Sequence, residues 1–460
     1  MNAPVNPKDL YPADLKVRDF QELSHVPGPP PARFRTWKTI KFLADPRGTI
    51  EGLANDYGHI FRRQDYMGWG VTLLGPEANE LVLFNRDKIF SNKLGWDPVL
   101  ELLFPNGLML MDFEPHRQDR KTLSVAFKPA PMKAYLNGLN EGIERRIGQW
   151  STADSFKFYP AIKDLTLDLA AGSFLGLPWG PEAVKINQAF TDMVRASVAI
   201  VRRPLPFTQM RRGVQGRAYM CDFFAREIPG RRGKEGDDFF TQFCNARNEA
   251  GELLGDQDII DHMNFLMMAA HDTLTSSITS LVYYLGINPD WQEKLREEVD
   301  GVRARHGDTL PYEALGELEL VEMAFKEALR LIPPVPMIPR RAVKDFEFAG
   351  YQIPAGSGVG INPLYTHHME EHWPEPERFD PLRFTTQMSA NRHKYAWVPF
   401  GGGAHMCIGL HYALMEARIV LFHLLGNYRV TLGTPDSGRR WQLVPLPRPR
   451  DGLPIVLEAV

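Results

Sequence analysis

One uninterrupted segment restricts the fold more than any other part of the chain, Asp258 to Leu285. Its 28 residues contain neither proline nor glycine, and it is followed by Gly286 and Pro289, which are typical of a helix end. An α-helix of this length is about 42 Å long, enough to cross the whole molecule. The first half of the segment is apolar on nearly every side, so we expect a buried helix.

A short polar stretch, His271-Asp272-Thr273, interrupts this apolar segment. Burying a carboxylate beside a hydroxyl is costly unless the two groups have partners or a chemical role. Ala269 and Thr273 share a face of the expected helix, and the small side chains of Ala269 and Ala270 leave room beside it. Asp272 and Thr273 are therefore candidate catalytic residues. The structural alternative is that Thr273 bonds to the Ala269 carbonyl and Asp272 pairs with a nearby charge.

A glycine-rich loop carries one cysteine, Cys407, directly before a strongly apolar helical segment, Ile408 to Leu425. Glycines allow a ligand to approach the backbone closely, so a bulky flat cofactor could lie against this loop. The start of the following helix favours the thiolate, which is the form that binds metal. One cysteine cannot build a zinc or iron–sulfur site, but it is enough as the axial ligand of a haem iron. The alternative is a structural cysteine in a turn.

This loop resembles the ligand loop of the cytochrome P-450 haem-thiolate monooxygenases. The matching residues are Phe400, Gly403, His405, Cys407 and Gly409. The resemblance implies a mostly α fold with a small β region around a buried haem b (iron protoporphyrin IX). It also implies that Cys407 is the metal ligand and that Phe400, His405 and Gly409 bind the cofactor.

Three further matches have the family's order and spacing, and the first is His116 with Arg120. The two lie four residues apart on one face of an expected helix, a spacing that a plain solvated face also produces. Arginine suits a carboxylate because its planar fork gives two charge-assisted hydrogen bonds. The resemblance implies that this pair contacts a haem propionate and that Arg340 takes the place of the second propionate-binding arginine.

The second match is the acid–alcohol pair in the long helix, Asp272 and Thr273. In the family a local opening of this helix holds water for proton delivery. The resemblance places Ala269 against the haem. The family usually has glycine where this chain has Ala270, which makes the helix distortion less expected here.

The third match is Glu327 with Arg330, the family's Glu-x-x-Arg, within an expected helix from Leu318 to Ile332. Apolar neighbours imply that the pair is buried and mutually satisfied. Arg383 completes the triad by its spacing to the cysteine loop, with Arg378 as the alternative. The resemblance gives all three a structural role in supporting that loop.

Several segments around the site have expected local structures. Leu94 to Leu110 is apolar but broken by Pro98, Pro105 and Gly107, which indicates a covering loop that by resemblance roofs the substrate pocket. Plain core packing remains open for each of its residues. Predicted pocket residues are Trp96, Leu103, Val335, Met337, Ile338 and Leu446. Other expected elements are a helix from Trp37 to Asn55, strands at Ile60–Gln64 and Val71–Leu74, lid helices at Phe190–Arg203 and Val214–Glu227, and a hairpin of Trp441–Leu446 with Pro454–Leu457.

Composition limits the partners and the compartment. The formal net charge of −3 gives no reason to expect nucleic acid, and three cysteines without pairing or metal-site spacing fit a reducing cytoplasm. The first 20 residues lack the apolar run of a signal peptide or membrane span. We expect an N-terminal extension over 1–26 and one catalytic domain over 27–460. By resemblance this is a bacterial-type cytoplasmic enzyme, monomeric and without a membrane anchor.

The resemblance implies insertion of one oxygen atom of dioxygen into a hydrophobic molecule of terpenoid, steroid, fatty-acid or aromatic type. The sequence carries no flavin, nicotinamide or iron–sulfur motif, so a separate ferredoxin and ferredoxin reductase, or a similar donor, are implied. Candidate docking residues are Arg117, Lys121, Lys128, Arg392 and Lys394. One alternative is a haem-thiolate isomerase or dehydratase that needs no electron donor. Another is a cysteine hydrolase with His405 as base.

Overall fold

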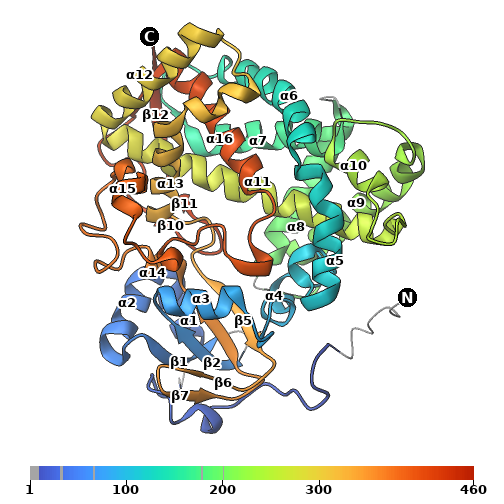
Figure 1. Ribbon diagram of the computed structural model, residues 1–460, viewed down its shortest axis with the longest axis vertical. Coiled ribbons are helices and arrows are strands. Elements are labelled where there is room, and N and C mark those ends of the chain that lie inside the picture. The colour runs from blue at the N-terminus through green and yellow to red at the C-terminus, as the bar shows by residue number, and fades with distance from the viewer. Residues whose placement is uncertain (1–9, 32–34, 66–67, 178–179, 200) are drawn as a thin grey trace.

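The computed structural model describes residues 10–31, 35–65, 68–177, 180–199 and 201–460. Residues 1–9 of the expected N-terminal extension lie outside this range. Figure 1 shows a large helical part and a smaller part at one end. In the smaller part, helices α1 (Arg35–Ala44), α2 (Pro46–Tyr57) and α3 (Pro76–Phe84) lie with the strands of the main sheet. The mostly α fold with a small β region that the sequence predicts is confirmed.

The helical part is built around α11 (Asp256–Ile287), which extends the expected segment by two residues at each end. The helix is apolar over most of its length and packs against neighbours on several sides, as a buried helix must. The other helices of this part are α4 (Lys93–Leu100), α5 (Phe113–Leu123), α6 (Pro129–Ile147), α7 (Phe158–Leu175), α8 (Pro181–Ser197), α9 (Gln209–Arg231), α10 (Phe239–Asn245), α12 (Pro289–His306), α13 (Glu319–Leu331), α14 (Pro363–Thr366), α15 (Thr386–Ser389) and α16 (Leu410–Asn427).

The β region centres on a five-stranded sheet with the order β1-β2-β8-β5-β3. Its strands are β1 (Ile60–Asp65), β2 (Gly68–Leu73), β8 (Gly358–Ile361), β5 (Ile338–Ala342) and β3 (Phe90–Ser91). Strands β2 and β8 run parallel, so segments almost 290 residues apart in the chain lie side by side. The small strands β6 (Phe346–Phe348) and β7 (Tyr351–Ile353) form a separate hairpin, and α3 (Pro76–Phe84) packs beside the sheet.

The expected single helix from Trp37 to Asn55 is wrong, because the segment forms two helices. These are α1 (Arg35–Ala44) and α2 (Pro46–Tyr57). Pro46 cannot continue the preceding helix, and the side chain of Asp45 accepts a hydrogen bond of 2.9 Å from the Gly48 amide. This stretch therefore ends one helix and caps the next.

The segment from Leu94 to Leu110 is more regular than predicted. Its first part lies in α4, and only the remainder is turn and 3₁₀ structure. Pro98 removes a single backbone hydrogen bond from this short helix. A Cβ atom added at Gly95 would lie 2.7 Å from the Arg340 Cα atom, so α4 packs directly on β5.

The predicted hairpin of Trp441–Leu446 with Pro454–Leu457 is also wrong. Strand β10 (Trp441–Gln442) pairs with β11 (Arg448–Pro449), and β12 (Pro454–Ala459) pairs with β9 (Tyr428–Leu432) and β4 (Phe156–Lys157). The alternating apolar residues of β12 find their partners on strands distant in the sequence, which a local pattern cannot reveal.

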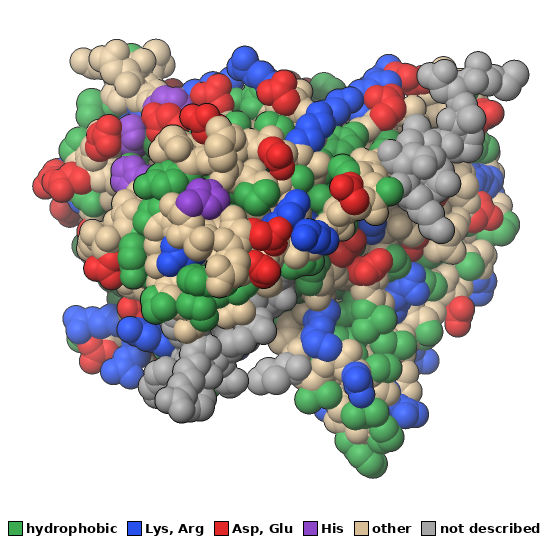
Figure 2. Space-filling model, turned by 90° about the horizontal axis from the view of Figure 1, so that it is seen from below, with side chains coloured by type: hydrophobic (Ala, Val, Ile, Leu, Met, Phe, Trp, Pro, Cys, Tyr) green, Lys and Arg blue, Asp and Glu red, His purple; other side chains and the backbone are tan. Residues whose placement is uncertain are grey.

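The surface mixes both signs of charge. On the face shown in Figure 2, acidic and basic side chains alternate, and hydrophobic side chains gather on a projection at one edge. No helix among the described residues is both long and apolar enough to cross a membrane.

Candidate active site

The cysteine loop is held by its glycines against the β region. Gly403 adopts a φ of +61°, and a Cβ atom added there would lie 2.1 Å from the Leu83 carbonyl oxygen in α3. Only glycine fits so close an approach in this conformation. The Cys407 amide donates a hydrogen bond of 2.8 Å to the Phe400 carbonyl, which folds the loop back on itself. The backbone therefore fixes where the sulfur points.

The surroundings of Cys407 act on the thiol in opposite directions. Burial of the loop raises the pKa of Cys407, while a hydrogen bond from the Gly409 amide and the positive charge of Arg120 lower it. The cysteine side chain nevertheless keeps exposed surface. The sulfur thus lies within the body of the protein and is open to a group placed over it. A bound metal would favour the thiolate, since a coordinating thiol is deprotonated.

Four basic side chains from two elements and the cysteine loop converge beside the sulfur. His116 and Arg120 come from α5, Arg340 from β5 and His405 from the loop. The imidazole rings of His116 and His405 stack with their centres 3.8 Å apart. Burial lowers the pKa of His116 to about 4, with a further contribution from the positive charges of Arg120 and Arg340. Burial also lowers the pKa of Arg340 to about 10, although the Asp112 charge acts in the opposite direction. The pKa of His405 is also lowered, first by burial and then by its three basic neighbours.

This basic cluster fits a ligand that carries carboxylates. The two nearest carboxylates are already engaged, Asp112 by several hydrogen-bond donors and Asp119 by His262 at 3.0 Å. Among the described residues Arg120 forms no ion pair with a carboxylate, and Arg340 bonds to the Pro339 carbonyl. Additional anions would lower the repulsion within the cluster. The arrangement therefore suits the two propionates of a haem whose iron meets Cys407.

The acid–alcohol pair is fully bonded within the protein. Thr273 donates a hydrogen bond of 2.7 Å to the Ala269 carbonyl. Asp272 accepts a hydrogen bond of 2.7 Å from Lys163 of α7 and lies 3.2 Å from His271 Nδ1. Helix α11 is continuous through this stretch, with alanine at position 270. The geometry is thus that of the structural alternative, in which both side chains bond to neighbours.

Asp272 is held as a carboxylate by its neighbours. Burial alone would raise its pKa, but the interactions with His271 and Lys163 outweigh burial and lower the pKa below its usual range. Lys163 was not singled out from the sequence. It lies more than 100 residues away, and only the packing of α7 on α11 reveals it.

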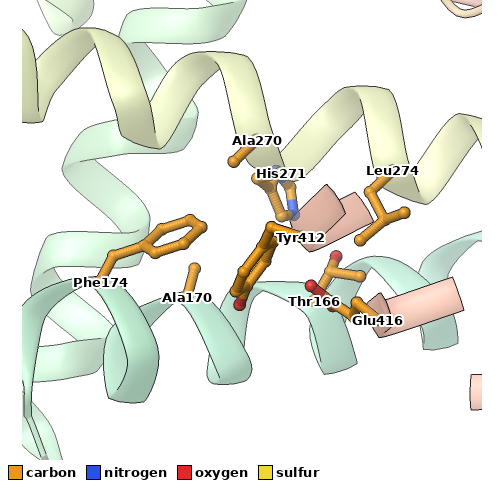
Figure 3. A pocket seen from close by; sticks show the side chains of 8 residues that line it. All are labelled: Thr166, Ala170, Phe174, Ala270, His271, Leu274, Tyr412 and Glu416. Atoms are coloured by element: carbon orange, nitrogen blue, oxygen red, sulfur yellow. The ribbon is translucent and has the colours of Figure 1, made fainter. Parts of the chain in front are cut away.

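A small polar pocket lies between α7, α11 and α16 (Figure 3). Its volume is about 10 Å³, room for roughly one water molecule. Glu416 of α16 lines this pocket, and burial raises its pKa to about 8 even though a hydrogen bond with Tyr412 acts in the opposite direction. Nearby, the hydroxyls of Thr166 and Thr275 lie 2.8 Å apart. Glu416 is not among the residues predicted from the sequence. Its position as the one acidic residue in the apolar Ile408–Leu425 segment could have indicated it.

The buried triad forms with Arg383. Glu327 lies 2.7 Å from Arg330 and 3.4 Å from Arg383, and both Glu327 and Arg330 are completely buried. Arg378 instead forms an exposed ion pair with Glu375. Arg330 also donates to the carbonyls of neighbouring loops, so the triad ties α13 to the chain that leads to the cysteine loop.

The predicted pocket residues fall into two groups. Trp96, Val335, Met337 and Leu446 keep exposed surface, whereas Leu103 and Ile338 are buried. A Cβ atom added at Gly213 of α9 would lie 3.3 Å from Leu103, so Leu103 packs under this helix as core. Leu446 lies in the turn between β10 and β11.

Arg392 makes contacts within the protein and keeps part of its surface exposed. Its guanidinium lies 3.9 Å from the centre of the Trp373 ring and donates to the Arg383 carbonyl, and its role in docking a partner stays a prediction. Of the other candidates, Arg117 and Lys121 pair with Glu249. Lys128 and Lys394 are exposed.

Comparison with known proteins settles the family. The family model described as Cytochrome P450 matches residues 27–451, nearly the whole chain. This chain belongs to the cytochrome P450 family. Its cofactor is accordingly haem, iron protoporphyrin IX, and the enzyme is an oxidoreductase. The cysteine-hydrolase alternative is thereby excluded.

This cytochrome P450 is similar to proteins from several different organisms. It is 40% identical over 395 residues to "Putative cytochrome P450 136" of Mycobacterium tuberculosis, covering 84% of this chain and 79% of the relative. It is 28% identical to "Taxane 10-beta-hydroxylase" of Taxus cuspidata, covering 78% and 73%. Among solved structures, "Retinoic acid bound cyanobacterial CYP120A1" superposes with a TM-score of 0.85 at 27% identity, covering 97% of this chain and all of that one.

Proposed function

We propose that this cytochrome P450 inserts one oxygen atom of dioxygen into a hydrophobic terpenoid, with electrons from a separate ferredoxin and ferredoxin reductase. The observation that carries the proposal is the open Cys407 beside a basic cluster that fits two propionates. The Asp272–Thr273 pair of α11 supplies the candidate groups for proton delivery. A haem-thiolate isomerase or dehydratase needs no such acid–alcohol pair, so this alternative is less favoured.

Each part of the site has a task in this reaction. The bound haem supplies the activation of dioxygen, and Cys407 as a thiolate ligand favours cleavage of the O–O bond. His116, Arg120, Arg340 and His405 would hold the propionates. The Phe400 carbonyl holds the Cys407 amide, and the Gly409 amide bonds to the sulfur. Ala269 offers a small side chain where the ring would face α11.

Proton delivery falls to Thr273 and Asp272. The Thr273 hydroxyl must leave the Ala269 carbonyl to donate into the site, since its proton is committed to that carbonyl. Asp272 stays ionised beside Lys163, so it can accept a proton and pass it on. The cycle therefore requires a side-chain rotation in α11 and a loosening of the Asp272–Lys163 pair.

The terpenoid class has support from the relatives and the predicted pocket. Relatives are named for taxane hydroxylation and for oxidation of β-amyrin, and one neighbouring structure is titled with bound retinoic acid. All three are isoprenoids. The partly exposed pocket candidates are Trp96, Val335, Met337 and Leu446. They are apolar and suit a rigid hydrocarbon skeleton with few polar groups.

The substrate test is a spectral titration of the holoenzyme with retinoic acid, a β-amyrin-type triterpene, a steroid and a long-chain fatty acid. We expect the isoprenoids to shift the haem spectrum at micromolar concentration and to give oxygenated product with ferredoxin, its reductase and NADPH. Product from the fatty acid or steroid alone would contradict the terpenoid assignment. Conversion without reductant would instead favour the isomerase or dehydratase.

Electron supply gives a second test on the surface. Lys128 and Lys394 are exposed basic residues, Lys128 directly before α6 and Lys394 shortly before the cysteine loop. We expect Lys128→Glu and Lys394→Glu to slow reduction by ferredoxin in a salt-dependent manner, because rim charges mainly govern association rates. Reduction by dithionite is the control and should not change.

A further inference from the structure

The N-terminal segment 10–31 is a strap along the β region and not a loose extension. Leu23 and Val26 are completely buried in the core of this region. The ring of Phe20 lies 5.0 Å from that of Trp69, and His25 bonds to the Gln352 carbonyl at 2.7 Å. The strap therefore contacts both the main sheet and the β6–β7 hairpin (Figure 1).

The strap ends at a carboxylate beside the basic cluster. Tyr11 donates a hydrogen bond of 2.7 Å to Oδ2 of Asp112, across 101 residues of sequence. The same carboxylate accepts a hydrogen bond from the Ser91 hydroxyl and one of 2.7 Å from the Asn92 amide. Asp112 is the residue directly before α5, the helix that carries His116 and Arg120.

Asp112 also faces the remaining members of the basic cluster. Its Oδ1 atom lies 4.0 Å from His405 Nε2, and its charge acts on the buried Arg340 guanidinium. One carboxylate thus bonds to the end of β3 and the start of α4, directly precedes α5, and faces basic groups of strand β5 and the cysteine loop. These are the elements that hold the groups assigned to the haem propionates.

We propose that Tyr11 is a positioning residue for the haem: by binding Asp112 it sets the basic cluster that holds the propionates. The inference rests on the assignment of that cluster to the propionates. Asp112 is buried, so each donor that it loses leaves its charge less compensated. Without the Tyr11 hydroxyl, Oδ2 keeps only Ser91, and Asp112 has more freedom to turn toward His405 and Arg340. Both would then bind a propionate less well.

The test is the rate at which the holoenzyme transfers haem to an excess of apomyoglobin. We expect Tyr11→Phe, which keeps the ring and removes the hydroxyl, to lose haem about tenfold faster, as befits one hydrogen bond to a charged group. Tyr57→Phe is the matched control. Tyr57 is a half-buried tyrosine of the β region, and among the described residues its hydroxyl has no hydrogen-bond partner. It should behave as wild type.

A double-mutant cycle separates positioning from general stability. Asp112→Asn should itself speed haem loss, and adding Tyr11→Phe to it should change the rate little, because the strap acts through the Asp112 charge. Equal haem loss in Tyr11→Phe and wild type would overturn the proposal, as would fully additive effects. A wild-type enzyme that holds haem without a thiolate spectrum would overturn the proposed function instead, and haem transfer would still report on Tyr11.

Discussion

Individual side chains at this site are bonded in ways that constrain how they act. Thr273 and Asp272 are both committed to partners within the protein, and their chemistry requires those bonds to open. Glu416, by contrast, is buried with few partners, so its charged form is disfavoured. Each case leads to a measurable expectation.

Thr273→Ala should uncouple reductant consumption from product formation. The variant should still bind substrate and accept electrons, but less product should form per electron and more hydrogen peroxide should be released. Asp272→Asn should slow turnover, by roughly 10²–10⁴-fold if acid–base assistance is lost. Coupling is measured as product and peroxide per NADPH consumed.

Thr279→Ala is the matched control for this prediction. Its hydroxyl makes the same kind of bond, 2.7 Å to the Thr275 carbonyl, further along α11. Coupling should stay at the wild-type level there. Unchanged coupling in Thr273→Ala as well would leave Thr273 with a structural role alone.

Glu416→Gln should remove a pH dependence of stability. The folded-state pKa of Glu416 is raised from 4.5 to about 8, so the folded protein keeps this proton over a range where the unfolded chain has released it. Stability should fall as pH rises between these two values, by at most about 1.4 kcal/mol per pH unit, and not change further above the upper one. Thermal unfolding from about pH 5 to pH 8 measures it. As pH rises, the unfolding midpoint of wild type should fall relative to that of Glu416→Gln. The exposed Glu371→Gln variant is the control and should follow wild type. If the midpoints of wild type and Glu416→Gln changed in parallel with pH, the expectation would be refuted.

At the scale of elements, two local arrangements hold the cysteine loop. The first is the contact of Gly403 with Leu83 in α3, and the second is the triad that ties α13 to the preceding loops. Both are structural, and both act on the haem through the loop that carries Cys407.

Gly403→Ala should displace the loop and lower haem content. The added methyl group would clash with the Leu83 carbonyl at 2.1 Å, and the backbone cannot move without shifting Cys407. Gly401→Ala is a matched control, since Gly401 has a similar φ of +69° but its nearest neighbour would be 3.7 Å away. Gly401→Ala should cost only the strain of the backbone, about 1–2 kcal/mol. Haem per protein in the purified variants decides between them, and equal haem content would contradict the close-approach argument.

Glu327→Ala and Arg330→Ala should each give protein that fails to retain haem. Removing one partner of a buried pair strands the other charge, at a cost of roughly 3–5 kcal/mol. Arg378→Ala removes only an exposed pair and should cost less than about 0.5 kcal/mol. Chemical unfolding with haem content measured in parallel tests this, and near-normal values in both triad variants would refute it.

At the scale of the whole molecule, the sequence predicts what is local or long and uniform. Both ends of helix α11 could be predicted to within two residues, because a long, mostly apolar segment without proline or glycine is compatible only with a buried helix. The pairing of β12 with β9, the ion pair of Asp272 with Lys163 and the bond of Tyr11 to Asp112 could not be placed. These contacts join segments far apart in the chain, and no periodicity in one segment reveals its distant partner. The contact of Arg392 with the Trp373 ring depends on packing in the same way.

The central claim, that Cys407 is the haem ligand, is tested most directly by the spectrum of the reduced carbon monoxide complex. The wild-type enzyme should show the thiolate form. Cys407→Ala should fold and lose both this spectrum and monooxygenase activity, because Cys221 and Cys244 lie within helices α9 and α10 and not in a glycine-rich loop beside the basic cluster. Cys221→Ala and Cys244→Ala should keep the wild-type spectrum. A Cys407→Ala protein whose reduced carbon monoxide spectrum matched wild type would contradict the account.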